Sequence, residues 1–256
     1  MRDYWEHKNL PVLAVLTSKV SLVPYERSHV PLYHDWMKDP VSTTAICRFN
    51  ADIDKDIQEA TASEPLSLEE EYSMQQSWRQ DNDKLTFIAC LPTLLSSDQV
   101  EVEAGALDSP NQMIGDVNLF LSVADEDPEG CIGELELMIA PTTQRRQGYG
   151  RATILAFMNY IQGHLPEILE EFAKKEKVEK MALLQLKVKI GGKNEKSIKL
   201  FESIGFIKVE ESANYFGEFE LVLEGFLGEQ STSRLLERFG VTGYREVEYR
   251  KEDTKS

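Results

Sequence analysis

The spacing of apolar and polar residues predicts a chain that mixes strands with helices. Residues 19–25 alternate between the two classes and predict a first strand, which is followed by a helix with the aromatic anchors Tyr33 and Trp36. Ser67 marks the start of a second helix, because glutamates fill the first turn, where carboxylates favour the positive end of the helix dipole. This helix is expected to end near Gln80.

Three more strands are predicted in the middle of the chain, at residues 85–91, 113–123 and 132–140. Polar stretches that contain Asp, Pro and Gly separate them, which is typical of an antiparallel meander. After Pro141 and a basic loop, apolar residues at helical spacing predict a helix at residues 149–161.

The second half of the chain adds a strand at residues 180–190, a helix at residues 194–204, and two strands at residues 206–210 and 215–223. Strand, loop, helix and strand in this order build a right-handed crossover inside a mixed sheet. The sequence therefore predicts an α+β fold.

Composition bounds the class of protein. With 256 residues, of which 41% are hydrophobic, the chain can bury one sizeable core. The apolar run at residues 10–16 is too short to span a bilayer and follows Asp3 and Glu6, so we expect neither a membrane span nor a signal peptide. The three cysteines lie far apart and show no metal-ligand spacing. This predicts reduced thiols and no metal site in a cytoplasmic protein, with the nucleus as an alternative.

The formal net charge of -16 argues against a nucleic-acid partner, since phosphate backbones attract clustered Lys and Arg. An acidic surface fits a cationic substrate, and it also fits a protein that is acidic only to stay in solution. Two short stretches hold many of the basic residues, namely Arg145, Arg146, Arg151, Lys187, Lys189, Lys193, Lys196 and Lys199.

The first basic stretch contains Arg145-x-x-Gly148-x-Gly150 between a predicted strand and a predicted helix. Backbone N–H groups at a helix N-terminus can converge on one anion, and glycine lets the backbone approach that anion closely. The arrangement favours a pyrophosphate site, although the motif by itself also fits an ordinary helix start.

A second motif, Asn194-x-x-Ser197 with Phe201 and a Gly205-Phe206 ending, follows a basic strand. Together the two motifs resemble the Gln/Arg-x-x-Gly-x-Gly/Ala loop and the Asn-x-x-Ser/Ala helix of the GNAT acetyltransferases. The resemblance implies the GNAT fold, a mixed and mostly antiparallel sheet of about six or seven strands flanked by about four helices. Core packing accounts for the last three residues of the motif, so Asn194 and Ser197 are expected to face the ligand.

The resemblance is closer still to one eukaryotic branch, the N-acetyltransferase-nine-like proteins of the ribosomal-protein-acetylating type. Its matching segments are residues 23–25 (VPY), 61–66 (TASEPL), 115–121 (GDVNLFL) and 138–140 (MIA). The domain organisation that we expect is an N-terminal extension at residues 1–14, an acetyltransferase domain at 15–226 and a charged tail at 227–256. Departures within the domain are an insert at 41–56, either a lineage-specific loop or a gene-model artefact, and variable, solvent-facing segments at 98–111 and 165–179.

Acetyl transfer to an amine needs a proton acceptor, because a free lysine with a pKa near 10.4 is protonated at pH 7. Removing that proton costs roughly 4 to 5 kcal/mol. Glu134 and Glu136 are two apart on a predicted strand, so they point to one face of the sheet and are candidate bases. The resemblance favours Glu134, while an exposed strand face would also explain both residues. It places Phe201 where the family often has a tyrosine acid. Either no dedicated acid is needed, because a thiolate is a tolerable leaving group near neutral pH, or Tyr215 is the candidate acid.

The resemblance implies acetyl-CoA as the acyl donor, without a metal. Backbone N–H groups around Ile139 are expected to hold the pantetheine arm and to polarise the thioester carbonyl. The residues expected to bind acetyl-CoA are Met138, Ile139, Ala140, Arg145, Arg146, Gln147, Gly148, Tyr149, Gly150, Arg151, Asn194 and Ser197.

The function implied by the resemblance is N-acetylation of a primary amine of a protein, on a lysine or an N-terminus, with tubulin as a candidate partner. Two alternatives stay open: acetylation of a polyamine or other small amine, and an acetyl-CoA-binding protein that acts through microtubules or other partners. The histidines are expected to be surface or packing residues, and they are His7, His29, His34 and His164.

Overall fold

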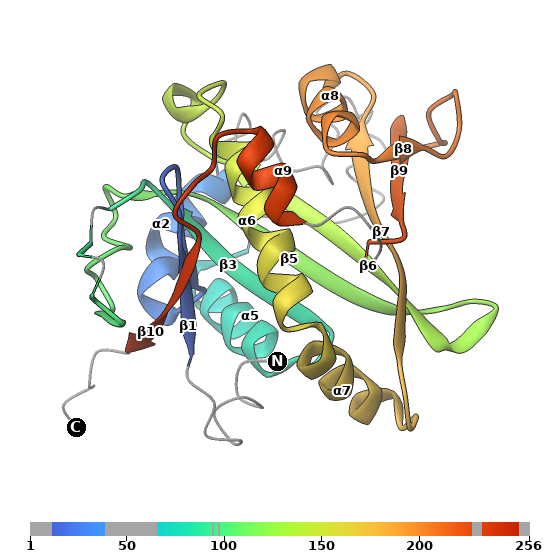
Figure 1. Cartoon of the computed structure of the whole chain (residues 1–256), viewed down its shortest axis with the longest axis horizontal. Helices are drawn as coiled ribbons and strands as arrows, with labels where there is room; N and C mark the ends of the chain where they lie inside the picture. The colour runs from blue at the N-terminus through green and yellow to red at the C-terminus, as the bar shows by residue number, and fades with distance from the viewer. Residues whose placement is uncertain (1–11, 39–65, 94, 97, 227–231, 251–256) are drawn as a thin grey trace.

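The computed structural model describes residues 12–38, 66–93, 95–96, 98–226 and 232–250. One sheet of ten strands runs through these residues in the order β4-β10-β1-β2-β3-β5-β6-β7-β9-β8 (Figure 1). The pairs β4·β10 and β6·β7 are parallel, and the other neighbours are antiparallel. The strands are β1 (Leu13–Leu16), β2 (Ser21–Pro24), β3 (Lys84–Cys90), β4 (Glu101–Glu103), β5 (Met113–Ala124), β6 (Asp127–Ile139), β7 (Ala182–Gly191), β8 (Ile207–Lys208), β9 (Glu218–Glu224) and β10 (Arg245–Arg250).

Helices cover both faces of the sheet. The described part of the chain contains six α-helices, which are α2 (Val30–Lys38), α5 (Leu68–Gln80), α6 (Tyr149–Gly163), α7 (Leu165–Glu176), α8 (Glu195–Ser203) and α9 (Thr232–Arg238). Short 3-10 turns, η1 (Arg27–His29) and η2 (Thr142–Gln144), precede α2 and α6. Helices α2 and α5 pack on one face of the sheet, and the other four pack on the opposite face, where α9 lies beside α6 (Figure 1).

The start of α5 follows from its sequence. Ser67 Oγ accepts a hydrogen bond from Glu70 N at 3.3 Å, and Glu70 Oε2 accepts one from Ser67 N at 2.8 Å. This reciprocal capping box satisfies two N–H groups that the helix itself leaves without a partner. The predicted beginning and end of this helix are both confirmed.

The α+β fold predicted from the sequence is confirmed, and so are the strands of the central meander and the crossover from β6 through α6 to the parallel strand β7. One helical segment differs from its prediction. Residues 165–179 were expected to face solvent as an extension of the preceding helix, yet α7 is a separate helix with Ile168 and Phe172 fully buried in the core. Its apolar residues recur at helical spacing among Glu and Lys, so one face packs and the other stays in water.

The sheet has more strands than predicted, because β1 at the boundary of the predicted extension, β4 in a predicted loop and β10 in the predicted tail each add one. Strand β10 from the tail pairs with β1 on one side and with β4 on the other. Its buried residues are Val247 and Tyr249, which alternate with Arg and Glu. This period-two pattern is the signal of a half-buried strand that the high charge of the tail obscured.

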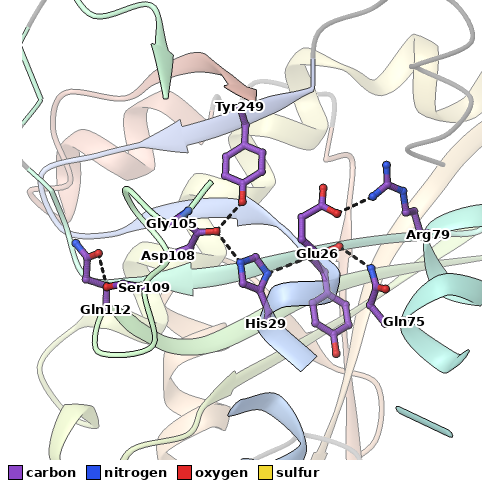
Figure 2. Close-up of polar contacts among 10 residues, drawn as sticks. Glu26, His29, Gln75, Arg79, Gly105, Asp108, Ser109, Gln112 and Tyr249 are labelled. Atoms are coloured by element: carbon purple, nitrogen blue, oxygen red, sulfur yellow. Dashed lines mark hydrogen bonds and ion pairs between the residues drawn. The ribbon is translucent and has the colours of Figure 1, made fainter. Parts of the chain in front are cut away.

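The segment at residues 98–111 is also more structured than expected. Asp108 is 4% exposed and accepts a hydrogen bond from Tyr249 Oη at 2.6 Å, which ties this segment to β10 (Figure 2). The insert at residues 41–56 lies outside the described residues. Among the helices of the described chain, none is long and apolar enough to cross a membrane.

Candidate active site

Strands β6 and β7 separate partway along their length. In the described chain, their pairing runs from Gly130↔Ala182 to Glu134↔Lys187 and stops there. Beyond that point β6 stays paired with β5 as far as Ile139, and β7 stays paired with β9 as far as Gly191. Residues 135–139 of β6 and 188–191 of β7 therefore border a gap in the sheet, which we call the open edge.

The register determines which amides face the open edge. Ala140 N donates to Ile114 O at 2.9 Å, so this amide belongs to the ladder with β5. Because successive amides of a strand point to opposite sides, Met138 N–H also points to β5, while the N–H groups of Leu137 and Ile139 point to the open edge. Of the three amides predicted to bind the ligand, only that of Ile139 faces the gap. Leu137 was missed, because its position depends on strand pairing.

The glycine loop closes one end of the open edge. Arg145 Nε donates to Ile139 O at 2.8 Å, and a terminal guanidinium nitrogen of Arg145 donates to Ala140 O at 2.9 Å. The Arg145 side chain thus joins the end of β6 to the loop. Gln147 Nε2 donates to Thr143 O at 2.6 Å within the same loop, and Arg146 is exposed.

Gly148 is the N-cap of α6 and has a φ of 87°, a left-handed conformation that favours glycine. The first N–H groups of α6, starting at Tyr149, have no acceptor within the helix. Gly150 lies between two other elements, and a Cβ there would make ordinary contacts, 3.5 Å from both Leu137 Cδ2 and Leu200 Cδ1. Strand β6, the start of α6 and helix α8 thus meet at one point.

On the far side of the open edge, Asn194 and Ser197 form the start of α8. Asn194 is the N-cap, and its Oδ1 accepts a hydrogen bond from Ser197 N at 3.2 Å. The pair predicted to face a ligand therefore also has a local structural role as a helix cap.

The C-terminal segment reaches the glycine loop as well. The guanidinium of Arg151, in the first turn of α6, lies 4.4 Å from the centre of the Phe239 ring, and that of Arg238 lies 5.2 Å from it. No sequence pattern connects this segment with the loop, since the contact depends on the packing of α9 along α6.

Glu134 and Glu136 share one face of the sheet, as their spacing predicted, and α2 and α5 cover that face. Glu134 Oε2 lies 3.2 Å from Lys189 Nζ and 3.7 Å from Lys187 Nζ. Glu136 is 7% exposed and pairs with Asn118 in the register of β5 and β6. The two candidate bases therefore differ, since one carboxylate is held by ammonium groups and the other is buried beside an amide.

A buried polar cluster surrounds Glu136. Its members on the sheet are Asp116, Asn118 and Glu136, and the buried residues near them are Tyr25, Tyr33 of α2 and Glu71 of α5. Burial raises the pKa of Asp116 to about 7, the charge of Glu136 adds to this rise, and the hydrogen bond from Asn118 opposes it. Asp116 and Asn118 were not predicted as site residues, although two polar residues at alternate positions of an apolar strand are a signal of a functional face.

Burial also raises the pKa of both Tyr25 and Tyr33, and the charges of Glu71 and Asp116 raise them further. The rings of Tyr25 and Tyr33 lie 5.3 Å apart. The carboxyl groups and phenols of the cluster are therefore close enough to influence one another's ionisation.

Other predicted residues have different surroundings. Phe201 is fully buried and packs edge-on against Phe206, which confirms its packing role. Tyr215 lies in an exposed turn, because β9 begins only at Glu218 instead of at residue 215. His29, His34 and His164 are packing residues with acidic partners, as expected. No group of metal ligands occurs among the described residues.

Comparison with known proteins agrees with this geometry. The acetyltransferase (GNAT) domain family matches residues 19–207. The N-acetyltransferase 9-like protein of Schizosaccharomyces pombe is 37% identical over 228 residues, covering 79% of this chain and 91% of its own. The human alpha/beta-tubulin-N-acetyltransferase 9 is 36% identical over 200 residues, covering 78% of this chain and 77% of its own.

Solved structures agree in fold. Spermidine N-acetyltransferase from Vibrio cholerae, in complex with CoA and spermine, superimposes with a TM-score of 0.51 at 16% identity over 82% of this chain and 99% of its own. The ribosomal L7/L12 alpha-N-protein acetyltransferase RimL, in complex with CoA, gives a TM-score of 0.50 at 12% identity over 82% of this chain and 96% of its own. With a family match over most of its length and relatives above 30% identity, the chain belongs to the GNAT acetyltransferase family and is an N-acetyltransferase.

Proposed function

We propose that this N-acetyltransferase uses acetyl-CoA to acetylate a primary amine of a protein, with tubulin as the candidate substrate. The observation that carries the proposal is the open edge between β6 and β7, which ends at the first turn of α6. One end of this gap offers helix amides suited to a diphosphate. Its flank offers the Leu137 and Ile139 amides to a pantetheine arm, which can add to a free strand edge by hydrogen bonding.

The residues present fit this substrate. Gly148 holds the left-handed turn that leaves the first amides of α6 accessible, and Arg146 adds an exposed positive charge beside them. The thioester supplies an activated acetyl group, and an amide N–H at the open edge can stabilise negative charge on its carbonyl oxygen. Arg145 contributes by fixing the carbonyl groups of Ile139 and Ala140, and hence the end of the strand.

The acceptor amine must lose a proton before it attacks. We propose Glu136 as the acceptor of that proton, with Glu134 as the second candidate. Glu134 forms ion pairs with Lys187 and Lys189, whereas Glu136 lies among the carboxyl groups and phenols of the polar cluster. Tyr215 stays a candidate acid, and its exposed turn is joined to the end of β7 by the hydrogen bond from Gly192 N to Gly217 O at 2.8 Å.

A protein acceptor is supported by the relatives, since those of Drosophila melanogaster and Homo sapiens carry the name alpha/beta-tubulin-N-acetyltransferase 9. Peptides that begin with the N-terminal residues of α-tubulin and β-tubulin are the first acceptors to test. Spermidine is the matched small amine. Acetylated product is measured by mass spectrometry, and released CoA is measured through the reaction of its free thiol.

Calorimetric titration tests the donor site. Wild-type protein is titrated with acetyl-CoA beside Gly148→Ala, which strains the turn, and Gly148→Glu, which strains it equally and adds a carboxylate. We expect Gly148→Glu to bind at least tenfold more weakly than Gly148→Ala, because like charges about 4 Å apart repel by roughly 1 to 4 kcal/mol. Equal affinity of the two variants, or a wild-type protein that does not bind, would contradict the proposal.

Turnover separates the remaining alternatives. Acetylation of spermidine but of neither peptide would favour a small-amine acetyltransferase. Binding of acetyl-CoA without turnover on any amine would favour a protein that retains acetyl-CoA as a ligand and acts through partners.

A further inference from the structure

Four polar side chains of the buried cluster carry atoms that have no hydrogen-bond partner in the described part of the protein. They are Tyr25 Oη, Glu71 Oε2, Asp116 Oδ1 and Asn118 Oδ1. Their residues are 5%, 3%, 3% and 3% exposed. Buried polar groups are normally paired, since leaving one unpaired costs about 1 to 3 kcal/mol. Several in one place indicate a missing ligand.

The chemistry of these atoms indicates the kind of ligand. The oxygens of Glu71, Asp116 and Asn118 are hydrogen-bond acceptors, and the Tyr25 hydroxyl can accept as well. Of the donors nearby, Asn118 Nδ2 donates to Asp116 Oδ2 at 2.6 Å, while His34 Nδ1 lies 3.8 Å from Glu71 Oε1, beyond hydrogen-bond distance. The cluster therefore has an excess of acceptors and of negative charge.

A primary ammonium group matches this excess. It carries one positive charge and donates three hydrogen bonds from one nitrogen, without accepting any. Its charge also offsets the cost of holding Glu71, Asp116 and Glu136 together in a buried site.

The position of the cluster agrees with such a ligand. Asp116 lies opposite Met138 in the register of β5 and β6, next to Ile139 at the open edge. Asn118 lies opposite Glu136, the proposed proton acceptor. An ammonium held by the cluster thus lies over strands β5 and β6, and β6 borders the open edge where the donor is proposed to bind.

We propose that Tyr25, Glu71, Asp116 and Asn118 form the recognition site for the ammonium group of the acceptor. The inference rests on the proposed function, in that it assigns to the same active site the groups that bind the amine. Tyr33 and Glu136 complete its surroundings, since the charge of Glu136 raises the pKa of Asp116 and the charge of Asp116 raises the pKa of Tyr33.

Solution NMR tests the site without needing the natural acceptor. The side-chain amide of Asn118 is the reporter, and the probe is n-propylammonium chloride added to the protein with and without acetyl-CoA. n-Propanol matches the probe without its charge, and tetramethylammonium chloride matches the charge without N–H donors. We expect a saturable shift of the Asn118 signals with n-propylammonium and none with either control compound. No shift, or an equal shift with either control compound, would overturn the proposal.

Variants sharpen this test. Asp116→Asn and Glu71→Gln should each weaken binding of n-propylammonium by roughly tenfold or more, because each replaces a carboxylate acceptor by a neutral amide and so removes the charge that strengthens the hydrogen bond to the ammonium. Asp125→Asn, the same change in the exposed turn between β5 and β6, should leave binding unchanged. Tyr25→Phe removes a hydroxyl that has no partner among the described residues, so we expect weaker binding without a loss of thermal stability.

Calorimetry with acetyl-CoA separates this inference from the function on which it rests. The proposal predicts that Asp116→Asn and Glu71→Gln keep the wild-type affinity for acetyl-CoA while losing that for n-propylammonium. Loss of both affinities in folded variants would show a general structural role and overturn the assignment. Failure of wild-type protein to bind acetyl-CoA, with ammonium binding intact, would count against the proposed function alone.

Discussion

His29 Nε2 and Asp108 Oδ2 lie 2.6 Å apart in the interior, where each residue is at most 4% exposed (Figure 2). Glu26 N donates to His29 Nδ1 at 3.0 Å, so Nδ1 is an acceptor and Nε2 carries the proton that it donates to Asp108. Asp108 also accepts hydrogen bonds from Tyr249 Oη at 2.6 Å and from Gly105 N at 2.7 Å. The Asp108 carboxylate thus joins η1 near the N-terminal part of the chain to strand β10.

Replacing Asp108 by Asn should destabilise the protein by roughly 2 to 4 kcal/mol at pH 7, because a buried charged acceptor is lost. Burial tends to raise the pKa of Asp108, but hydrogen bonds from His29 and Tyr249 outweigh it and lower that pKa. Its contribution is therefore present above the unfolded-state pKa of about 3.9 and is lost as the pH falls through the folded-state value. Urea unfolding at pH 7, 5 and 3 should show the difference between wild type and variant shrinking at pH 3. A difference that does not change with pH would contradict this account.

Tyr249→Phe should lower the free energy of unfolding by roughly 1.5 to 3 kcal/mol, since it removes a hydrogen bond to a buried carboxylate. Tyr215→Phe is the matched control, because Tyr215 is 87% exposed and its loss should change stability by less than about 0.5 kcal/mol. Equilibrium denaturation of both variants checks the prediction. Equal effects would mean that β10 is not anchored through Tyr249.

Asp116→Asn should stabilise the folded protein at pH 8. Burial raises the pKa of Asp116 to about 7, above its unfolded-state value. Asp116 therefore destabilises the folded state at a pH where its carboxyl group is ionised. The penalty develops as the pH rises from about 4 to 7, and it amounts to roughly 2 to 4 kcal/mol above pH 7. Urea unfolding should therefore show a gain for the variant at pH 8 that largely disappears at pH 4.5. A variant that is less stable at pH 8 would disprove the prediction.

Glu136→Gln should reduce kcat for the best peptide acceptor by roughly 100-fold or more, the usual contribution of a general base. Glu134→Gln should have a smaller effect on kcat, because its carboxylate is engaged by Lys187 and Lys189. The affinity for acetyl-CoA, measured by calorimetry, is the control for intact folding. Unchanged turnover in the double variant would show that neither glutamate is the base.

Much of the fold could be read from the sequence, because local pattern and local chemistry carry it. Ser67 and the glutamates after it specify the start of α5, and the alternation in residues 113–123 specifies β5. The predicted start of strand β9 at Tyr215 was wrong. Aromatic residues favour strands, yet β9 begins three residues later, after the turn at Gly217. Local preference could not show where pairing with β7 starts.

The candidate site divides in the same way. The sequence by itself determined the glycine loop, the start of α8 at Asn194 and the face shared by Glu134 and Glu136, because each depends on residues close together in the chain. Only the tertiary structure decided which amides face the open edge, that Arg145 braces the strand, and that Asp116 shares a buried cluster with Tyr25 and Glu71. Those relationships depend on strand register and on helices packed across the sheet, and spacing along one chain carries no information about either.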